Sequence, residues 1–263
     1  MKLRKRNLYM GENTKKKSLQ VGFISLGCAK NQVDTEIMIA KLKKAGYKIT
    51  NNTEKADVII INTCGFIEDA REEAVNTILH TGQLKVDGHL QYMVATGCLA
   101  QRYGSELLDE IPELDGVIGI SSFIAIDKHM DSILAGNRVC LVDKPGDIFF
   151  EKGPRVLTTP AGSAYLKITE GCNNRCSYCA IPSIRGQLRS RPVHELLEEA
   201  RELAGKGIKE LVLIGQDTAL YGQDLHGEDS LYNLTQQLTG VDGLEWIRLL
   251  YLHPAHIKDD LID

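Results

Sequence analysis

The sequence predicts an α/β protein with two parts, a doubly wound parallel-sheet domain followed by the first half of a (β/α) partial barrel. Short apolar runs alternate along the chain with amphipathic stretches of helical period. Such alternation favours a parallel sheet with right-handed crossovers. Several Pro and Gly residues within 144–162 separate two series of these elements, as is typical of a linker.

The first series, residues 19–143, is expected to form the doubly wound domain. Its predicted strands are Val21–Leu26, Val58–Asn62, Tyr92–Thr96, Val117–Ile120 and Val139–Val142. The predicted helices between them are Asp34–Ala45, Glu68–Leu79, Ser105–Asp109 and Phe123–Leu134. Gly46 follows the first helical pattern, where glycine often ends a helix because it readily adopts the left-handed conformation.

The second series, residues 163–263, is expected to form the partial barrel. Strands are predicted at Tyr165–Thr169, Leu211–Ile214 and Trp246–Leu252, and helices at Val193–Lys206 and Leu231–Leu238, with another helix beginning within Ile257–Asp263. Three β/α units cannot close a barrel, and an uncovered edge strand favours aggregation. We therefore expect the chain to be a shortened copy of a longer protein, and an inactive fragment is one alternative to an enzyme.

Composition and charge narrow the functional classes. The chain has 263 residues, 43% of them apolar, and its seven cysteines are too sparse for a disulfide scaffold. It has neither an apolar run of about 18 residues for a membrane helix nor the apolar core of a signal peptide, so a cytoplasmic protein with reduced thiols and no membrane partner is expected. Residues 1–18 carry seven Lys or Arg and one Glu, a net charge of +6, so the rest of the chain carries −10 of the total of −4. The basic segment is expected to be a disordered tail, with nucleic-acid contact as the lesser option, and the acidic remainder argues against a large phosphate-binding surface.

The most informative motif is C-x3-C-x2-C, formed by Cys172, Cys176 and Cys179. Three thiolates on one loop can each bind one iron of a cubic 4Fe–4S cluster, which leaves the fourth iron open. S-adenosylmethionine can chelate such an iron through its amino and carboxylate groups. Zinc is the alternative, but zinc loops usually offer two cysteine or histidine pairs, and no second pair follows here.

This motif resembles the signature of the radical S-adenosylmethionine superfamily, including the aromatic Tyr178 before the third cysteine. The resemblance implies that Tyr178 lies beside the adenine of S-adenosylmethionine. It also implies that Gly215, Gln216 and Asp217, at the end of the second predicted barrel strand, supply polar contacts to that cofactor. From their position alone, these three residues are equally consistent with a turn.

Three further cysteines, Cys28, Cys64 and Cys98, each follow a predicted strand of the first series and are spaced about one β/α unit apart. Because parallel strands end at the same edge of a sheet, these cysteines should lie at one edge. They are interpreted as ligands of a second 4Fe–4S cluster with one open iron, and zinc with a bound water is the competing interpretation. Cys140 is interpreted as a small buried hydrophobic residue.

Two sets of three cysteines in this arrangement resemble the methylthiotransferases. Segments similar to the branch that modifies ribosomal protein S12 are Ser25–Asn31, Ile181–Gly186, Arg189–Pro192 and Ile214–Thr218. The resemblance implies two 4Fe–4S clusters, S-adenosylmethionine, an electron donor such as flavodoxin or ferredoxin, and insertion of a methylthio group at an aspartate β-carbon of S12. The branch that modifies tRNA adenosines is the alternative, and a non-catalytic iron–sulfur protein is a third possibility.

Charged residues near the motifs leave further alternatives. Arg185, Arg189 and Arg191 follow the cysteine loop and could pair with a carboxylate of cofactor or substrate. They could equally form a solvated basic loop. His253 and His256 follow the third barrel strand and are interpreted as ordinary loop histidines.

Overall fold

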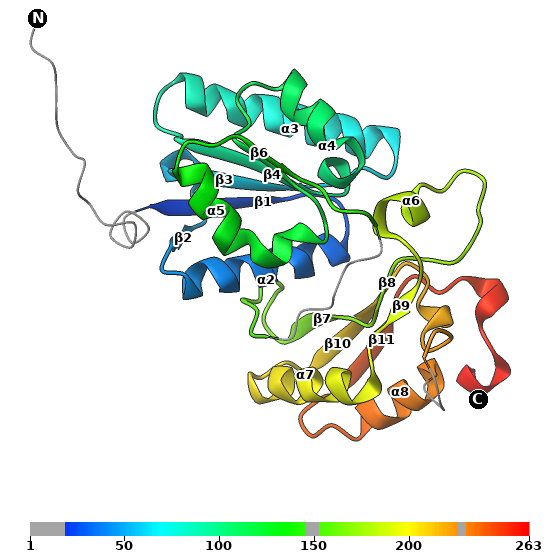
Figure 1. The fold of residues 1–263 in the computed structure, drawn as a ribbon. Coiled ribbons are helices and arrows are strands. Elements are labelled where there is room, and N and C mark those ends of the chain that lie inside the picture. The colour runs from blue at the N-terminus through cyan, green and yellow to red at the C-terminus, as the bar shows by residue number, and fades with distance from the viewer. Residues whose placement is uncertain (1–18, 146–152, 226–229, 263) are drawn as a thin grey trace, which may run out of the picture.

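The computed structural model describes residues 19–145, 153–225 and 230–262 (Figure 1). The predicted basic tail, residues 1–18, and the middle of the predicted linker lie outside the described residues. The described parts of residues 144–162 form neither a helix nor a strand.

The N-terminal part is built on one parallel sheet of six strands in the order β2-β1-β3-β4-β5-β6. The strands are β1 (Gln20–Ser25), β2 (Lys48–Thr50), β3 (Val58–Thr63), β4 (Tyr92–Gly97), β5 (Gly116–Ile118) and β6 (Val139–Leu141). Helices α2 (Ala29–Lys44) and α5 (Ile126–Leu134) pack on one face, and α3 (Glu68–Val86) and α4 (Cys98–Glu110) pack on the other. This arrangement confirms the predicted doubly wound fold.

The C-terminal part contains a three-stranded parallel sheet in the order β11-β10-β7. Its strands are β7 (Ser163–Lys167), β10 (Glu210–Ile214) and β11 (Trp246–Leu249), and a short antiparallel pair joins β8 (Thr169–Glu170) to β9 (Arg189–Ser190). Helices α7 (Val193–Gly205) and α8 (Leu231–Thr239) cover one face of the three-stranded sheet. The short helix α6 (Ile181–Arg185) follows the cysteine loop.

Helix α2 lies between the two sheets. Its Met38 and Leu42 pack into the N-terminal core, whereas Val33 packs against Val212 and Ile214 of β10. A helix that is buried on two sides has no single apolar stripe. For this reason the sequence predicted its start at Asp34, whereas the helix begins at Ala29.

Three other features differ from the prediction. Helix α4 begins at Cys98 instead of Ser105, and Gly104 interrupts its regular helical conformation. The interpretation of Cys140 as a buried residue is wrong, because its side chain is exposed on β6 at the edge of the sheet. A short 3-10 turn at Asp259–Leu261 stands where another helix was expected.

The residue before Cys98 makes the closest backbone approach in this region. Gly97 has φ +92°, and a Cβ added there would meet Asn62 Oδ1 and lie 2.5 Å from the Thr63 carbonyl oxygen and 2.8 Å from the Thr63 nitrogen. We therefore expect Gly97→Ala to lower the free energy of unfolding by about 2–5 kcal/mol, since backbone strain and steric overlap both contribute.

Gly88 provides the matched control for this substitution. It has a similar φ of +96° but has no atom within 4 Å of the added Cβ. Gly88→Ala should cost only the backbone strain of about 1–2 kcal/mol. Equal losses for the two variants in urea unfolding would contradict the close approach at Gly97.

Candidate functional site

The structure places the three dispersed cysteines at the carboxyl ends of three adjacent strands. Cys28 follows β1 and precedes α2, Cys64 directly follows β3, and Cys98 is the first residue of α4 after β4. The carboxyl edge of a parallel sheet commonly holds ligands. The sequence analysis expected the three side chains at this edge, and this is where they lie.

The loops that carry these cysteines are tightly packed. A Cβ added at Gly27 would lie 3.1 Å from Cys64 Sγ, and one added at Gly65 would lie 2.9 Å from the Cys98 carbonyl carbon. Burial raises the pKa of the Cys98 thiol, the Arg185 guanidinium opposes that change, and charge on Cys28 and Cys64 raises the pKa further. The close approach of these loops therefore places the three cysteines beside one another at the edge of the sheet.

The C-x3-C-x2-C loop runs from β8 to α6. Cys172 is buried, whereas Cys176 and Cys179 are half-buried. The Asn174 amide donates to Cys172 Sγ at 3.4 Å, and the Cys179 amide donates to the Cys176 carbonyl at 3.0 Å. Burial raises the pKa of Cys172, and the charges of Asp217, Cys179 and Cys176 contribute in the same direction.

Each cysteine set offers three sulfur donors, which fits a 4Fe–4S cluster with one iron left for an external ligand. Within the part of the chain that the structure describes, no three His, Cys, Asp or Glu side chains are already arranged to hold a metal ion. Metal ligands usually have to be deprotonated and drawn together on binding. The assignment of all six cysteines as cluster ligands stays a prediction, as does the choice between iron and zinc.

The predicted cofactor residues at the end of β10 lie beside the cysteine loop. Gln216 Nε2 donates to Glu170 at 3.0 Å, and Asp217 Oδ2 accepts a hydrogen bond from Asn174 Nδ2 at 2.9 Å. Among the described residues, Gln216 Oε1 and Thr169 Oγ1 are buried without a hydrogen-bond partner. Buried polar atoms normally have partners, so these two atoms fit a polar ligand above the strand ends.

The two remaining cofactor positions differ in their surroundings. The Gly215 carbonyl accepts a hydrogen bond from Lys30 Nζ at 2.8 Å. Tyr178 is 85% exposed and makes no ring contact with the described part of the chain. Its surface is free to pack against a planar ligand, so its predicted place beside adenine stays open.

The histidines after β11 take part in this region. His256 Nδ1 lies 2.7 Å from Asp217 Oδ2, and the His253 amide donates to Asp217 Oδ1 at 3.2 Å. The sequence analysis treated both histidines as ordinary loop residues. Their position after a parallel strand of the same sheet was the available signal that they would meet Asp217.

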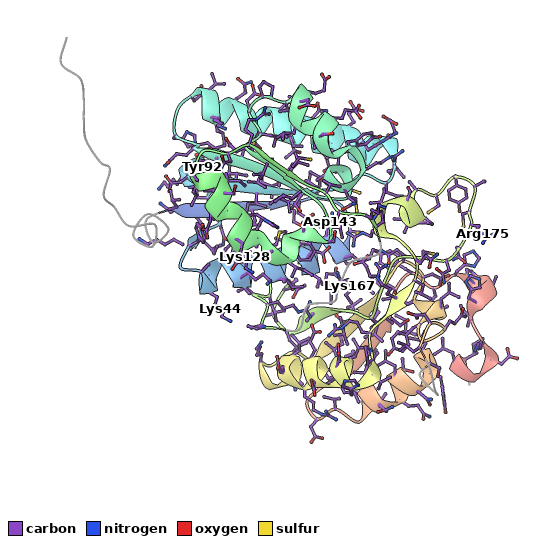
Figure 2. All side chains as sticks on the ribbon, viewed as in Figure 1. Lys44, Tyr92, Lys128, Asp143, Lys167 and Arg175 are labelled. Atoms are coloured by element: carbon purple, nitrogen blue, oxygen red, sulfur yellow. The ribbon has the colours of Figure 1, made fainter. Side chains whose placement is uncertain are left out.

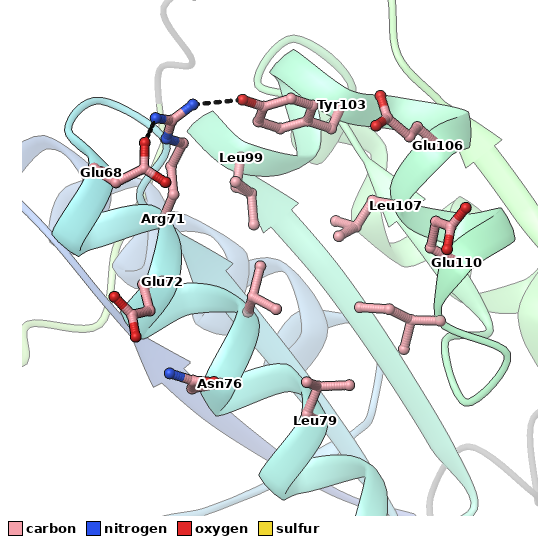
Figure 3. Close-up of a pocket in the computed structure, with 12 residues that line it drawn as sticks. Glu68, Arg71, Glu72, Asn76, Leu79, Leu99, Tyr103, Glu106, Leu107 and Glu110 are labelled. Carbon is pink, nitrogen blue, oxygen red and sulfur yellow. Dashed lines mark hydrogen bonds and ion pairs between the residues drawn. The ribbon is translucent and has the colours of Figure 1, made fainter.

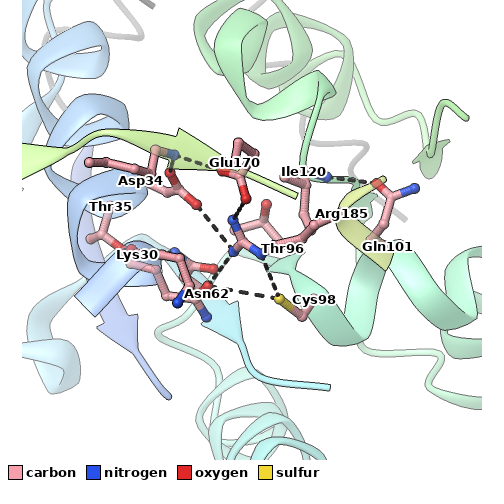
Figure 4. Close-up of polar contacts among 12 residues, drawn as sticks. Lys30, Asp34, Thr35, Asn62, Thr96, Cys98, Gln101, Ile120, Glu170 and Arg185 are labelled. Carbon is pink, nitrogen blue, oxygen red and sulfur yellow. Dashed lines mark hydrogen bonds and ion pairs between the residues drawn. The ribbon is translucent and has the colours of Figure 1, made fainter. Parts of the chain in front are cut away.

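A buried network of charged groups surrounds Arg185 next to Cys98 (Figure 4). Arg185 bonds to Glu170 at 2.8 Å, to Asn31 Oδ1 at 2.8 Å and to Cys98 Sγ at 3.3 Å. Lys167 pairs with Asp34 at 2.5 Å and with Glu170 at 3.0 Å. Figure 2 places Lys167 between the two sheets and Arg175 on the cysteine loop.

The three arginines after the cysteine loop were expected to bind a ligand or to face solvent, and neither alternative describes Arg185. Its side chain is 1% exposed and is paired with protein carboxylates. Arg191 is paired with Glu199 at 2.6 Å, and Arg189 donates to the Arg185 carbonyl at 2.9 Å. Sequence reasoning missed this network because charged contacts between separate parts of a chain have no periodic signal.

Glu170 is the central anion of the network. Burial by itself would raise its pKa, but the Arg185 and Lys167 charges outweigh burial and hold the pKa well below its usual range. The resulting stabilisation is present above the ordinary glutamate pKa and is lost as the pH falls toward the lowered value.

We expect Glu170→Ala to lower the free energy of unfolding by about 3–5 kcal/mol, because it leaves buried cations without their shared carboxylate. Glu245→Ala is the control, since its pair with Lys209 is exposed on both sides and such pairs contribute about 0–1 kcal/mol. Thermal and urea unfolding at neutral pH measure both changes. Similar small losses in the two variants would contradict the role of Glu170.

Comparison with known proteins identifies two family models in the chain. Residues 20–119 match the uncharacterized protein family UPF0004, and residues 166–251 match the radical SAM superfamily. Cys28, Cys64 and Cys98 lie within the first match, and Cys172, Cys176 and Cys179 lie within the second.

The chain is similar to curated proteins described as ribosomal protein uS12 methylthiotransferase RimO. It is 58% identical to the one from Syntrophomonas wolfei, with 93% of this chain and 56% of the relative aligned. It is 49% identical to those from Pelotomaculum thermopropionicum and Symbiobacterium thermophilum, again over 93% of this chain and over 55% and 50% of the relatives. The chain thus spans about half the length of the curated relatives that it matches.

Among solved structures, the fold is similar to the radical S-adenosylmethionine methyltransferase TsrM from Kitasatospora setae. The TM-score is 0.53 at 12% sequence identity, with 84% of this chain and 52% of that chain covered. At this identity the likeness concerns the fold alone. In the described residues, no helix is both long and apolar enough to cross a membrane.

Proposed function

Because this chain belongs to the radical S-adenosylmethionine methylthiotransferase family, we propose that it acts in attaching a methylthio group to the β-carbon of an aspartate in ribosomal protein S12. The substrate class follows from relatives described as uS12 methylthiotransferases that are 49–58% identical over 93% of the chain. The acidic charge of residues 19–263 favours a basic protein partner over a phosphate backbone.

One observation carries the proposal. Two sets of three cysteines lie at the carboxyl ends of two parallel sheets, and Arg185 connects them through Cys98 and Glu170. A single-cluster electron carrier has no need for two three-thiol sets held this close together. The arrangement suits a reaction that needs two neighbouring iron–sulfur sites.

The overall change replaces one β C–H bond of aspartate by a C–S bond. When bound, two 4Fe–4S clusters and two molecules of S-adenosylmethionine would supply this chemistry. One S-adenosylmethionine, with an electron from a flavodoxin- or ferredoxin-type donor, would leave as methionine and as 5′-deoxyadenosine that carries the hydrogen. The other would methylate the sulfur of a sulfide source and leave as S-adenosylhomocysteine, and the electron released when the C–S bond forms would return to a cluster.

The protein's own residues bind and position these groups. Cys172, Cys176 and Cys179 would hold one cluster, and Cys28, Cys64 and Cys98 the other. Tyr178 would pack on the adenine, and the unpartnered Gln216 Oε1 would meet a polar group of S-adenosylmethionine. Asp217 fixes the cysteine loop through Asn174, which keeps the cofactor site aligned with the strand ends.

Mass spectrometry of ribosomal protein S12 and of bulk tRNA tests the substrate assignment. Both are isolated from cells that contain or lack the full-length gene. We expect the methylthio group on the S12 aspartate only when the gene is present, with tRNA adenosines unchanged. A methylthio group on tRNA with unmodified S12 would overturn the substrate assignment and favour the tRNA branch.

A further inference from the structure

A single buried side chain contacts both cysteine regions. Arg185 ends α6, directly after the C-x3-C-x2-C loop, and its Nε lies 3.3 Å from Cys98 Sγ. Its Nη1 lies 2.8 Å from Glu170, which ends β8 just before that loop. Its Nη2 lies 2.8 Å from Asn31 Oδ1 in the first turn of α2, next to Cys28.

The chemistry of this contact goes beyond holding two parts of the protein together. A guanidinium stays protonated under all ordinary conditions, so Cys98 faces a permanent positive charge. Hydrogen bonds to ligating sulfurs and nearby charge set the potential of an iron–sulfur cluster. Because reduction adds negative charge to a cluster, a fixed cation beside one of its sulfurs favours the reduced state.

We propose that Arg185 is a positioning residue that fixes the Cys98 sulfur and raises the reduction potential of the cluster bound by the N-terminal cysteines. Glu170 ties the same guanidinium to the start of the C-x3-C-x2-C loop, so this side chain helps to set the spacing of the two cysteine sets. This inference rests on the proposed function only in requiring a cluster on Cys28, Cys64 and Cys98.

Lys30 makes a second connection, from the N-terminal part of the chain to the C-terminal sheet. It leaves the first turn of α2 beside Cys28 and donates to the Gly215 carbonyl at the end of β10. Its ammonium group lies 4.3 Å from the centre of the Tyr251 ring, a cation–π contact. The two contacts place cations from both halves of the molecule between the cysteine sets.

The test uses full-length protein in which Cys172, Cys176 and Cys179 are replaced by alanine, so that only the N-terminal cluster remains after anaerobic reconstitution. Arg185→Met and Arg185→Lys are compared with this parent by iron analysis and by a redox titration followed by electron paramagnetic resonance. We expect a more negative potential for Arg185→Met and a smaller shift for Arg185→Lys, which keeps the charge but not the guanidinium fork.

Arg155→Met is the matched control. Arg155 is also buried and joins the two halves through Glu36 and Glu199, but it does not contact a cysteine in the described structure. The Arg155→Met variant should have a lower melting temperature but an unchanged reduction potential of the N-terminal cluster. An unchanged potential in Arg185→Met, or an equal shift in Arg155→Met, would overturn the role of Arg185. Absence of iron from the parent would overturn the proposed cluster itself and with it this role.

A second, independent observation concerns the opposite face of the N-terminal sheet. Helices α3 and α4 border a groove of about 570 Å³ (Figure 3). Leu79, Leu99, Leu107 and Ile111 provide apolar surface, and Glu68, Glu72, Glu106 and Glu110 are the acidic residues of its lining. The basic residue among the lining side chains, Arg71, is paired with Glu68 and bonded to the Tyr103 hydroxyl at 2.7 Å.

The groove begins beside the N-terminal cysteines. Leu99 directly follows Cys98, and Glu68 starts α3 shortly after Cys64. Between Cys64 and α3, Phe66 and Ile67 are 39% and 54% exposed. Apolar surface therefore continues from the cysteine edge into the groove.

We infer that this groove docks a segment of the basic protein substrate that carries both apolar and Lys or Arg side chains. Apolar contacts in a groove provide affinity, and complementary charge provides orientation and faster association. An acidic lining excludes a nucleic-acid backbone as the preferred occupant. The inference deepens the proposed function, because it names the surface that would hold the protein substrate.

The test measures binding of purified ribosomal protein S12 to the full-length enzyme by calorimetry. The double variant Glu72→Lys, Glu106→Lys should weaken binding by about tenfold, or about 1.4 kcal/mol, and leave S-adenosylmethionine cleavage unchanged. Glu198→Lys, Glu202→Lys on the exposed side of α7 is the control with the same charge change. Unchanged binding of S12 by the double variant would overturn the inference. If its melting temperature also falls while binding stays unchanged, another part of the chain fills the groove. Modification of S12 is scored separately, so failure of the proposed function is recognised independently.

Discussion

Replacement of Cys172, Cys176 and Cys179 by alanine is expected to abolish cleavage of S-adenosylmethionine in the full-length enzyme. It should also remove about half of the iron, or about four of roughly eight atoms per chain, because each set would hold one cubane cluster. The physical reason is the loss of all three sulfur ligands on one loop. Iron analysis and chromatographic detection of 5′-deoxyadenosine measure the two effects.

Cys140→Ala is the control for this experiment, since Cys140 is exposed and lies outside both cysteine sets. It should retain its full iron content and its activity. If the triple variant also keeps all of its iron, the loop does not hold a cluster.

Replacement of Cys28, Cys64 and Cys98 by alanine should have a different result. The variant should also lose about half of the iron, but it should still form 5′-deoxyadenosine. Methylthio insertion should fall below detection, because the second site would no longer be assembled at the edge formed by β1, β3 and β4.

Mass spectrometry of the protein substrate and chromatography of the cofactor products separate these two activities. Loss of both together would indicate that the N-terminal cysteines are structural. The unfolding transition of each variant is recorded alongside, since Cys98 is buried against Arg185 and truncation of a buried side chain lowers stability. Only a variant that unfolds close to the parent temperature counts toward the assignment.

The sequence was sufficient to predict most of the strands, because β3 and its neighbours are nearly continuous apolar runs between turn residues. It missed the short strands β2 and β9, which have no such run. It was also sufficient to place Cys28, Cys64 and Cys98 at one edge, since parallel strands end together. It was less informative for the first two turns of α2, where Lys30, Asn31 and Asp34 are buried in spite of their polarity. Those positions are decided by tertiary contacts.

In the candidate site, too, some features could be predicted from the sequence and others depend on tertiary contacts. The cysteine motif identified its own loop, because the spacing itself carries the chemistry. Glu170 and Arg185 flank the cysteine loop and pair with each other, and Arg185 also bonds to Asn31 and Asp34 of helix α2. Nothing in the local sequence distinguishes such a pair from an exposed one, so the structure was needed to find it.

The position of α2 between the two sheets has a geometric consequence. The first turn of α2 carries Lys30 and Asn31, and its next turn carries Val33 against β10. Contacts from this one rigid helix therefore help to fix the distance between the two cysteine sets. An α-helix turns by about 100° per residue. A single inserted residue near Gln32 would therefore rotate the end next to Cys28 away from Arg185 and Gly215, while every strand could stay in place. A change of length in this turn should therefore disturb the placement of the two cysteine sets, even where the strands keep their positions.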